Sequence, residues 1–328
     1  MKSLPLQIAG LLALAAPLPA QDLPVLEVYT YDSFVTEWGP GPAVEAAFEA
    51  DCACDVRFTA QGDGAALLAR LRLEGGRTDA DIVLGLDTNL IAAARGTGLF
   101  APHGMSPDLD LPVDWDDPDF LPYDWGWFAF VANVGTNLPE SLEELAASDL
   151  SIVIQDPRSS TPGLGLVLWV AAAYPDRAEE IWAELADNIV TVTPGWSEAY
   201  GLFTDAEVDA VLSYTTSPSY HLLAEDDDGK VAMIFDEGHA LQIEVAGKVA
   251  STDQPDLADD FLAFMLTDGF QGAIATTNWM FPAVTPAGGL PDGFADPAAV
   301  PRAIYLTPEE AAELRDPAID AWRAALSR

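Results

Sequence analysis

Aromatic side chains stand in four turn-like segments that lie far apart in the chain. The segments are Tyr29–Phe34, Gly195–Tyr200, Ser213–His221 and Asn278–Pro282, and each mixes rings with small polar residues. Core aromatics normally fall on periodic apolar runs, so rings on separate, punctuated segments indicate a cleft assembled from distant parts of the chain. Such rings can stack on a planar organic ligand, and tryptophan favours a cationic one.

A second feature is the segment QDPRSSTPGLG, which follows a predicted strand and opens a helix. Ser160 or Thr161 can cap this helix, and Pro162 fits its first position. The free backbone donors and the helix dipole would then attract an anion, to which Arg158 could add positive charge. Asp63-Gly64, at another helix start, is a weaker candidate of the same type. Ordinary capping requires the same residues, so both interpretations stay open.

Catalysis is one alternative, because Gly195-Trp196-Ser197-Glu198-Ala199 resembles the Gly-x-Ser-x-Gly turn of serine hydrolases. The last position is Ala199 rather than glycine, and His221 or His239 would have to serve as the base. A helix-capping serine beside a cleft-facing tryptophan explains the same residues without requiring a catalytic histidine. A secreted serine hydrolase is therefore kept only as an alternative of another class.

Metal binding is another alternative, because Tyr214, Tyr220 and His221 offer the phenolate and imidazole ligands that ferric iron accepts. No compact cluster of Asp, Glu and His joins them in the sequence. A ferric-ion receptor thus remains the second alternative, and stacking of the rings on an organic ligand is preferred.

The chain begins like a secreted protein. Lys2 precedes a mostly apolar run, Leu4 to Ala16, and small residues lead to the polar Gln21. The run is too short to span a bilayer comfortably, which is typical of a signal peptide. We expect residues 1–20 to be the signal peptide, with cleavage near Ala20.

Charge and cysteine content limit the class of binding partner and the state of the two cysteines. The formal net charge is −39, and it becomes −40 without the predicted signal peptide, whose one charged residue is Lys2. Nucleic acid is excluded as a partner, because phosphate contacts need a basic surface. The acidic surface either serves solubility in a salty exterior or attracts a cationic ligand. Cys52 and Cys54 form a small disulfide or remain two thiols, and the disulfide is preferred.

Predicted strands and helices alternate along the chain. Strands are predicted at 26–31, 55–59, 82–84, 123–131, 152–154, 189–193 and 210–212, and helices at 43–50, 65–74, 163–173, 198–203, 255–266 and 268–275. This alternation predicts an α/β fold with a largely parallel sheet. The pattern starts afresh after the strand at 123–131, which could cross from one lobe to another, so we expect two α/β lobes with a cleft between them.

Several of these segments together resemble a known family. The chain is similar to the periplasmic thiamine-binding proteins of bacterial ABC importers at Val28–Phe34, Trp38–Pro42, Phe48–Cys52, Asp81–Asp87, Gln155–Arg158, Gly195–Tyr200, Ser213–Pro218 and Asn278–Met280. The resemblance covers essentially the whole mature chain. It implies a two-lobed type II periplasmic binding protein fold with the ligand in the interlobe cleft. Lobe 1 would comprise residues 21–125 plus 246–328, and lobe 2 residues 126–245.

The resemblance also implies a function and a site. It implies a non-catalytic, monomeric periplasmic receptor, without cofactor or metal, that captures thiamine or its mono- or diphosphate and delivers it to a membrane permease. The residues expected to contact the pyrimidine and thiazolium rings, or the linker between them, are Tyr31, Trp38, Trp196, Tyr214, Tyr220 and Trp279. Those expected around the phosphate end are Asp63, Gly64, Ser160, Thr161 and the backbone of Trp196.

Overall fold

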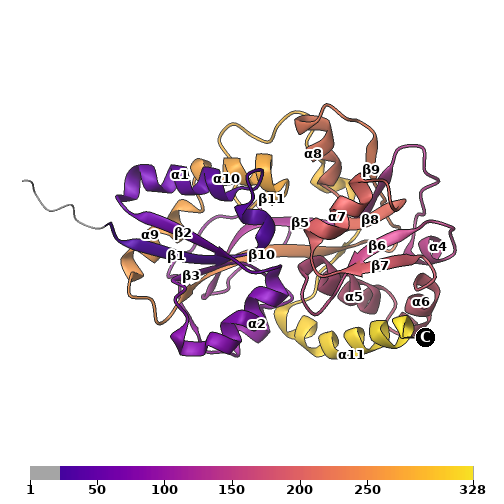
Figure 1. Cartoon of the computed structure of the whole chain (residues 1–328), viewed down its shortest axis with the longest axis horizontal. Coiled ribbons are helices and arrows are strands. Elements are labelled where there is room, and N and C mark those ends of the chain that lie inside the picture. The colour runs from indigo at the N-terminus through magenta and orange to yellow at the C-terminus, as the bar shows by residue number, and fades with distance from the viewer. Residues whose placement is uncertain (1–22, 328) are drawn as a thin grey trace, which may run out of the picture.

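Two lobes lie side by side in the computed structural model of this chain (Figure 1), which describes residues 23–327. The predicted signal peptide, residues 1–20, lies outside the described residues. Within residues 23–327, no helix is both long and apolar enough to cross a membrane.

The first lobe is centred on three parallel strands, β1 (Val25–Thr30), β2 (Asp55–Ala60) and β3 (Ile82–Asp87), with β1 in the middle. Every residue of β3 is buried, as is typical of a parallel strand covered on both faces. The helices of this lobe are α1 (Gly41–Cys52), α2 (Gly64–Glu74), α3 (Ile91–Arg95), α9 (Pro255–Phe264) and α10 (Asp268–Ala273).

The second lobe has its own parallel strands, β6 (Ile152–Gln155), β7 (Ile189–Thr193) and β8 (Ala210–Tyr214), with β6 in the middle. Its helices are α4 (Leu142–Ala146), α5 (Thr161–Ala173), α6 (Ala178–Leu185), α7 (Trp196–Thr204) and α8 (Ser217–Ala224). The first ten residues of α5 are all buried, because this helix is apolar on every side and fills the interior of the lobe.

Two long antiparallel strands, β5 (Phe120–Asn133) and β10 (His239–Val249), cross from one lobe to the other (Figure 1). β10 pairs with β3 in the first lobe, and β5 pairs with β8 in the second, so the order is β2-β1-β3-β10-β5-β8-β6-β7. The ladder of β10 with β5 is irregular between Glu244 and Val245, and its ladder with β3 is irregular between Val245 and Ala246. Shorter elements are the strands β4 (Phe100–Ala101), β9 (Lys230–Ala232), β11 (Phe281–Pro282) and β12 (Ala303–Ile304), the 3₁₀ turns Asp32–Val35, Gly75–Arg77 and Pro297–Ala299, and the π-helical turn Ile274–Asn278.

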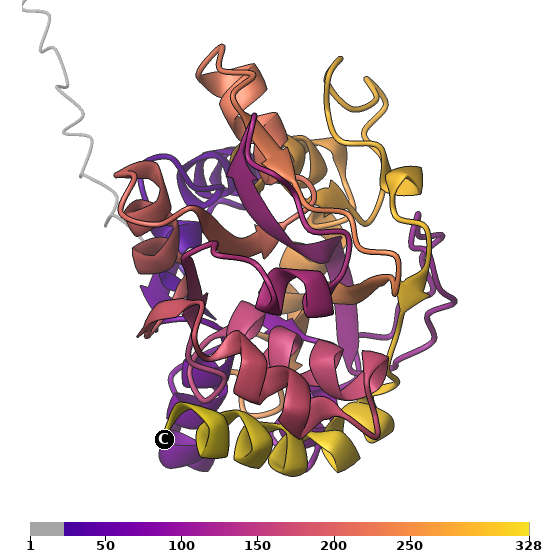
Figure 2. The same ribbon diagram turned by 90° about the vertical axis from the view of Figure 1, so that its right-hand side faces the viewer.

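The last helix, α11 (Pro308–Leu326), lies against α5 and α6 (Figure 2). Its start is fixed by a capping box, in which Thr307 and Glu310 each accept a backbone N–H of the other. The end of the chain therefore packs on helices of the second lobe, although residues 246–328 were expected in the first. The boundaries at 125/126 and 245/246 stay a prediction.

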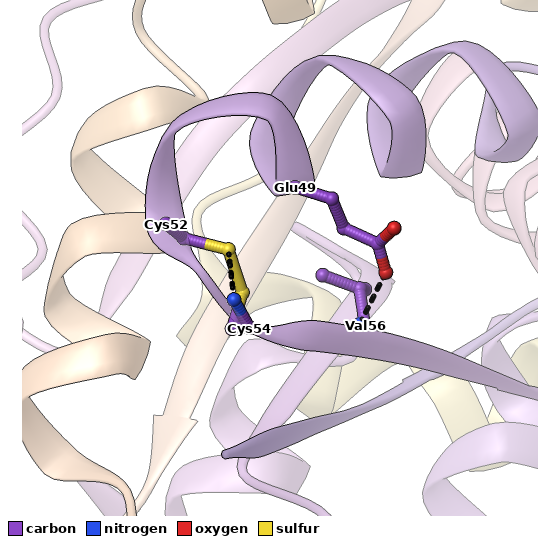
Figure 3. The surroundings of a disulfide bond; sticks show 4 residues. All are labelled: Glu49, Cys52, Cys54 and Val56. Atoms are coloured by element: carbon purple, nitrogen blue, oxygen red, sulfur yellow. Dashed lines mark hydrogen bonds between the residues drawn. A yellow bond between two sulfur atoms is a disulfide. The ribbon is translucent and has the colours of Figure 1, made fainter. Parts of the chain in front are cut away.

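Cys52 and Cys54 form a disulfide at the turn from α1 into β2 (Figure 3), with 5.2 Å between their Cα atoms. In the same turn the Glu49 carboxylate accepts a hydrogen bond from the backbone N–H of Val56, at 2.8 Å. Both contacts tie the end of the helix to the start of the strand.

The predicted α/β fold is confirmed, with parallel sheets in each lobe and an antiparallel pair between them. Each predicted strand and helix is present, with ends shifted by a few residues. The helices α4, α6, α8 and α11 were not predicted; the first three have eight residues or fewer, and α8 and α11 contain proline.

Candidate functional site

A cavity of about 330 Å³ lies between the lobes, a volume suited to a small organic molecule. Its walls come from both lobes and from the crossing strand β10. Nine of the ten predicted site residues line it, namely Tyr31, Trp38, Asp63, Gly64, Thr161, Trp196, Tyr214, Tyr220 and Trp279. The tenth, Ser160, is fully buried behind the wall.

Aromatic rings of the cavity lining contact each other in two pairs, one tilted and one edge-to-face. Trp38 of the first lobe and Trp196 of the second have ring centroids 6.3 Å apart, and Trp279 and Tyr220 have centroids 5.7 Å apart. Trp196 is fixed from behind, because its ring stacks on Tyr200 with centroids 4.8 Å apart. The Trp38 side chain is 55% exposed, which leaves its ring free at the cavity mouth.

Trp279 adopts a backbone conformation that is unusual for its type. Its φ angle is 57°, in the left-handed region, directly after the π-helical turn Ile274–Asn278. π-turns and left-handed non-glycine residues both occur preferentially at functional sites, where the surrounding structure holds them in place. The strained turn aims this ring and Asn278 at the cavity.

The predicted phosphate end contains a carboxylate of the protein itself. Asp63 precedes α2, and its Oδ2 accepts hydrogen bonds from the Ser160 hydroxyl at 2.6 Å and from the backbone N–H of Trp196 at 3.1 Å. Burial raises the pKa of Asp63 to about 6, although both hydrogen bonds act in the opposite direction. The starts of α2, α5 and α7 thus converge on this carboxyl group.

Two expectations about this end are wrong. Ser160 precedes α5 but makes no capping hydrogen bond, because its hydroxyl donates to Asp63 instead. Arg158 does not add charge to the site, since it pairs with Asp156 and its side chain is 59% exposed.

Gly64 lies where the start of α2 in the first lobe meets the start of α5 in the second. A Cβ at this position would lie 2.7 Å from the backbone oxygen of Gly85 and 2.7 Å from Oγ1 of Thr161. Both contacts are too short for carbon, so any larger residue would push α2 away from the start of α5. A glycine is required here for the lobes to meet.

Two acids at the crossing strands, one of which lines the cavity, were missed by the sequence interpretation. Glu244 of β10 lines the cavity, and its Oε2 accepts hydrogen bonds from the hydroxyls of Tyr31 at 3.1 Å and Tyr123 at 2.5 Å. Burial raises the pKa of Glu244 to about 7, helped by the nearby Asp87. The available signal was the one acidic residue of β10, because burying a charge inside a strand is costly unless it has a partner or a role.

Asp124 of β5 is the second missed acid. It is fully buried, and its Oδ2 accepts a hydrogen bond from Asn278 Nδ2 at 2.7 Å. Burial and the neighbouring Glu244 raise its pKa well above the usual value. Asn278 lines the cavity and so links this acid to the strained turn before Trp279.

Neither His221 nor His239 is hydrogen-bonded to Ser197, so neither forms a catalytic triad with it. His221 bonds to Tyr200 and Glu225 through its two nitrogens, at 2.9 and 2.7 Å. His239 bonds to backbone atoms of Phe128 and Phe235 in the same way. Ser197 is not the helix cap either, because α7 begins at Trp196 and Gly195 occupies the cap position.

The tyrosines also fit iron poorly. Burial raises the pKa of Tyr214 well above its usual value, and the hydrogen bond to Glu225 raises that of Tyr220 to about 12. A phenolate ligand requires the opposite shift. Both His221 nitrogens are already bonded, and Tyr214 and Tyr220 line the cavity as neutral side chains.

Comparison with known proteins agrees with this geometry. The family model for bacterial extracellular solute-binding proteins matches residues 42–277. The thiamine-binding periplasmic protein of Escherichia coli (strain K12) is 51% identical over 332 residues, which cover 100% of this chain and 99% of that protein. The protein of the same name from Brucella suis biovar 1 is 48% identical over 100% of both chains. The chain belongs to the family of thiamine-binding periplasmic proteins.

Solved structures place this family among proteins of one fold. A periplasmic thiamin binding protein superposes with a TM-score of 0.91 at 49% identity, over 96% of this chain and 100% of that one. Iron-bound HitA from Pseudomonas aeruginosa has a TM-score of 0.74 at 21% identity, over 92% of this chain and 99% of that one. The second likeness shows the fold alone, and the predicted two-lobed type II periplasmic binding protein fold is confirmed.

Proposed function

We propose that this protein captures thiamine in the periplasm and delivers it to the permease of an ABC importer, without catalysing a reaction. The observation that carries the proposal is the interlobe cavity, which combines aromatic rings on its walls with buried carboxyl groups on its floor. Such a site suits a flat organic cation of this size. The names of the relatives, at up to 51% identity, support the same ligand.

The rings and the acids recognise different parts of the ligand. The thiazolium ring carries a permanent positive charge but no N–H donor, so it would lie against the face of one of the cavity-lining rings, Trp38, Trp196, Tyr220 or Trp279. Each desolvated cation–π contact contributes on the order of 1–2 kcal/mol. The aminopyrimidine carries N–H donors, which match the carboxyl oxygens of Glu244. The role of each of these residues is part of the proposal.

The mono- and diphosphate of thiamine are proposed as further ligands. Support comes from Asp63, whose carboxylate accepts the Ser160 and Trp196 donors at the starts of α5 and α7. An oxyanion is therefore accepted at this point, as at other helix N-termini. A phosphate group would take these donors only if the Asp63 side chain turned away or bound a proton.

Isothermal titration calorimetry tests the ligand directly. Mature protein, freed of bound ligand by unfolding and refolding, is titrated with thiamine, and we expect a single site with a Kd at or below the micromolar range. Mass spectrometry of ligand released from the freshly purified protein gives an independent check. No heat at micromolar thiamine and no thiamine in the released fraction would contradict the proposal.

Export and oligomeric state are separate parts of the proposal. Sequencing the N-terminus of protein from a periplasmic fraction should find a start at or near Gln21, as the predicted cleavage near Ala20 requires. Light scattering on the same sample should give the mass of a monomer. A retained Met1 would contradict the first expectation, and twice the mass would contradict the second.

A further inference from the structure

Three acidic residues stand next to one another on neighbouring strands at the point where the chain crosses between the lobes. In the ladders of β10, Glu244 lies directly opposite Asp87 of β3 and directly opposite Asp124 of β5. Residues opposite each other in antiparallel strands project to the same face, with Cβ atoms about 4.5–5.5 Å apart. Asp87, Glu244 and Asp124 therefore form a row of carboxyl groups, called the acid row below.

The acid row is buried and lacks a matching positive charge. Asp87 and Asp124 are fully buried and Glu244 is 7% exposed. The side chains that donate hydrogen bonds to the row are all neutral, and they are Tyr31, Tyr123, Asn89, Gln242 and Asn278. Within the described residues, no lysine, arginine or histidine forms an ion pair with the row. Arg315 of α11 acts on Asp87 through its charge, as the weakest of the influences on that group.

Two oxygens of the row have no hydrogen-bond partner. They are Oδ1 of Asp87 and Oδ1 of Asp124, and both are buried. A buried carboxyl oxygen without a donor is costly, and such atoms require an explanation in a folded protein. Both residues flank Glu244, the member of the row that lines the cavity, so positive charge brought by a ligand to Glu244 would also act on them.

The row is open to the cavity at Glu244, which lines it together with Tyr31 and Asn278. Two further groups face the row from other elements. Asp63 at the start of α2 repels a negative charge on Glu244, and the hydroxyl of Tyr214 on β8 is neutral because burial raises its pKa. A cation that enters the cavity thus meets acidic groups at the floor and aromatic rings on the walls.

The row cannot be fully ionised while the cavity is empty. Burial raises the pKa of Glu244 to about 7 and that of Asp87 to about 7, and burial together with Glu244 raises that of Asp124 well above its usual value. Near neutral pH the empty site therefore holds protons. An opposite charge a few ångströms away favours the ionised form of a carboxyl group and lowers its pKa.

We propose that the acid row is a cation-binding floor that exchanges a proton for the positive charge of the ligand. On binding, an O–H bond of the row breaks and its proton passes to the solvent buffer. The remaining carboxylate is balanced by the ligand cation, and the amino group of an aminopyrimidine can donate to Glu244, the member of the row that lines the cavity. This inference rests on the proposed function for the identity of the ligand.

Proton release makes affinity depend on pH in a defined direction. Below the pKa of the empty row, binding must displace a proton, so affinity rises by up to about tenfold per pH unit, and it levels off above that pKa. Lowering the pH from about 7.5 to about 5.5 should therefore weaken thiamine binding by roughly ten- to a hundredfold.

Calorimetry with thiamine in buffers of different ionisation enthalpy tests the exchange on the mature protein. At about pH 6.5 we expect roughly 0.5–1 proton released per thiamine bound. Glu244→Gln keeps the size of the side chain but cannot ionise, so it should abolish most of the release, flatten the pH dependence and weaken binding at least about tenfold at pH 7.5. Asp124→Asn serves as a second variant of the row, and circular dichroism checks that each variant folds.

Two further variants identify the source of the proton. Glu198 is exposed and lies outside the cavity lining, so Glu198→Gln should leave release and affinity unchanged. Asp63→Asn removes the other buried acid of the cavity, and release should persist in it. The inference would be overturned if Asp63→Asn lost the release of a proton on thiamine binding while Glu244→Gln and Asp124→Asn kept it.

The outcomes separate this inference from the proposed function. If thiamine binds without proton exchange at any pH, the role proposed for the acid row is wrong. The same holds if both Glu244→Gln and Asp124→Asn bind thiamine with unchanged affinity. Either result would still agree with the proposed thiamine receptor. A wild-type protein that does not bind thiamine would overturn the receptor and the inference with it.

Discussion

The Asp63 carboxylate accepts a hydrogen bond from the Ser160 hydroxyl across the cleft, with 2.6 Å between Oδ2 and Oγ. Asp63 precedes α2 in the first lobe, and Ser160 precedes α5 in the second. Opening the cleft breaks this contact, so Asp63 contributes to holding the lobes together. The same carboxylate occupies donors that a phosphate ester would need.

Asp63→Asn should change the preference among the proposed ligands. The amide removes a negative charge that faces two helix starts, so repulsion of a phosphate group disappears while an acceptor oxygen for Ser160 remains. We expect the affinity for thiamine monophosphate, relative to that for thiamine, to rise by at least about tenfold, equivalent to about 1.4 kcal/mol. Calorimetric titration of both ligands measures this ratio. Asp32→Asn, at an exposed acid of the same lobe, is the control, and an equal ratio in all three proteins would contradict the role given to Asp63.

Gly64→Ala should impair closure of the lobes without unfolding either one. The added Cβ would meet Gly85 and Thr161 at 2.7 Å, so α2 and α5 would have to separate. We expect thiamine binding to weaken by roughly five- to a hundredfold, because the closed form would cost on the order of 1–3 kcal/mol more. Small-angle scattering with saturating thiamine should show a more open particle.

Gly201→Ala is the matched control for this variant. Gly201 lines the same cavity, but nothing lies within 4 Å of a Cβ built there. It should bind thiamine nearly as the wild type does. Equal affinities in the two variants would show that the approach at Gly64 does not matter for binding.

Trp196→Ala and Trp279→Ala should each weaken thiamine binding by roughly five- to a hundredfold, since each removes a ring face worth about 1–3 kcal/mol. The fold should persist, because neither ring belongs to the fully buried core. Phenylalanine at either position should recover part of the loss, as it restores a ring. Tryptophan fluorescence and calorimetry follow binding, and wild-type affinity in both alanine variants would rule out the aromatic clamp.

His239 should make the stability of the protein depend on pH. Its Nε2 accepts the backbone N–H of Phe235 at 2.9 Å, so Nδ1 carries the proton and donates to the Phe128 carbonyl at 2.7 Å. Burial lowers the pKa of His239 to about 4, from 6.5. In this pH range His239 binds a proton in the unfolded chain but not in the folded one. The free energy of unfolding therefore decreases as the pH falls from about 6.5 to about 4.

His239→Gln isolates this effect. Relative to the variant, the wild type should lose on the order of 3 kcal/mol of unfolding free energy between about pH 7 and pH 4. Urea unfolding of both proteins at each pH measures the difference between their unfolding free energies. The contributions of the buried carboxyl groups, which both proteins contain, cancel in this difference. A difference that is independent of pH would mean that His239 is not held neutral in the folded protein.

Much of the architecture follows from local patterns that the sequence displays. The β1 and β2 strands and α2 were predictable from their alternating patterns, and α5 from an apolar run that opens at Pro162 and is too long for a buried strand. The aromatic turns were also visible, and most of them do meet in one cavity. The order of the eight paired strands was not predictable in this way, because it depends on contacts between distant residues.

Which partner each polar group takes was decided by the tertiary structure. Ser160 has the sequence context of a helix cap, yet closure of the lobes brings Asp63 within reach and the stronger, charged acceptor takes its hydroxyl. Likewise Asp87, Glu244 and Asp124 look like unrelated acids in the sequence. They form a row only because the register of β10 sets them opposite one another, and strand register is a long-range property that no local pattern encodes.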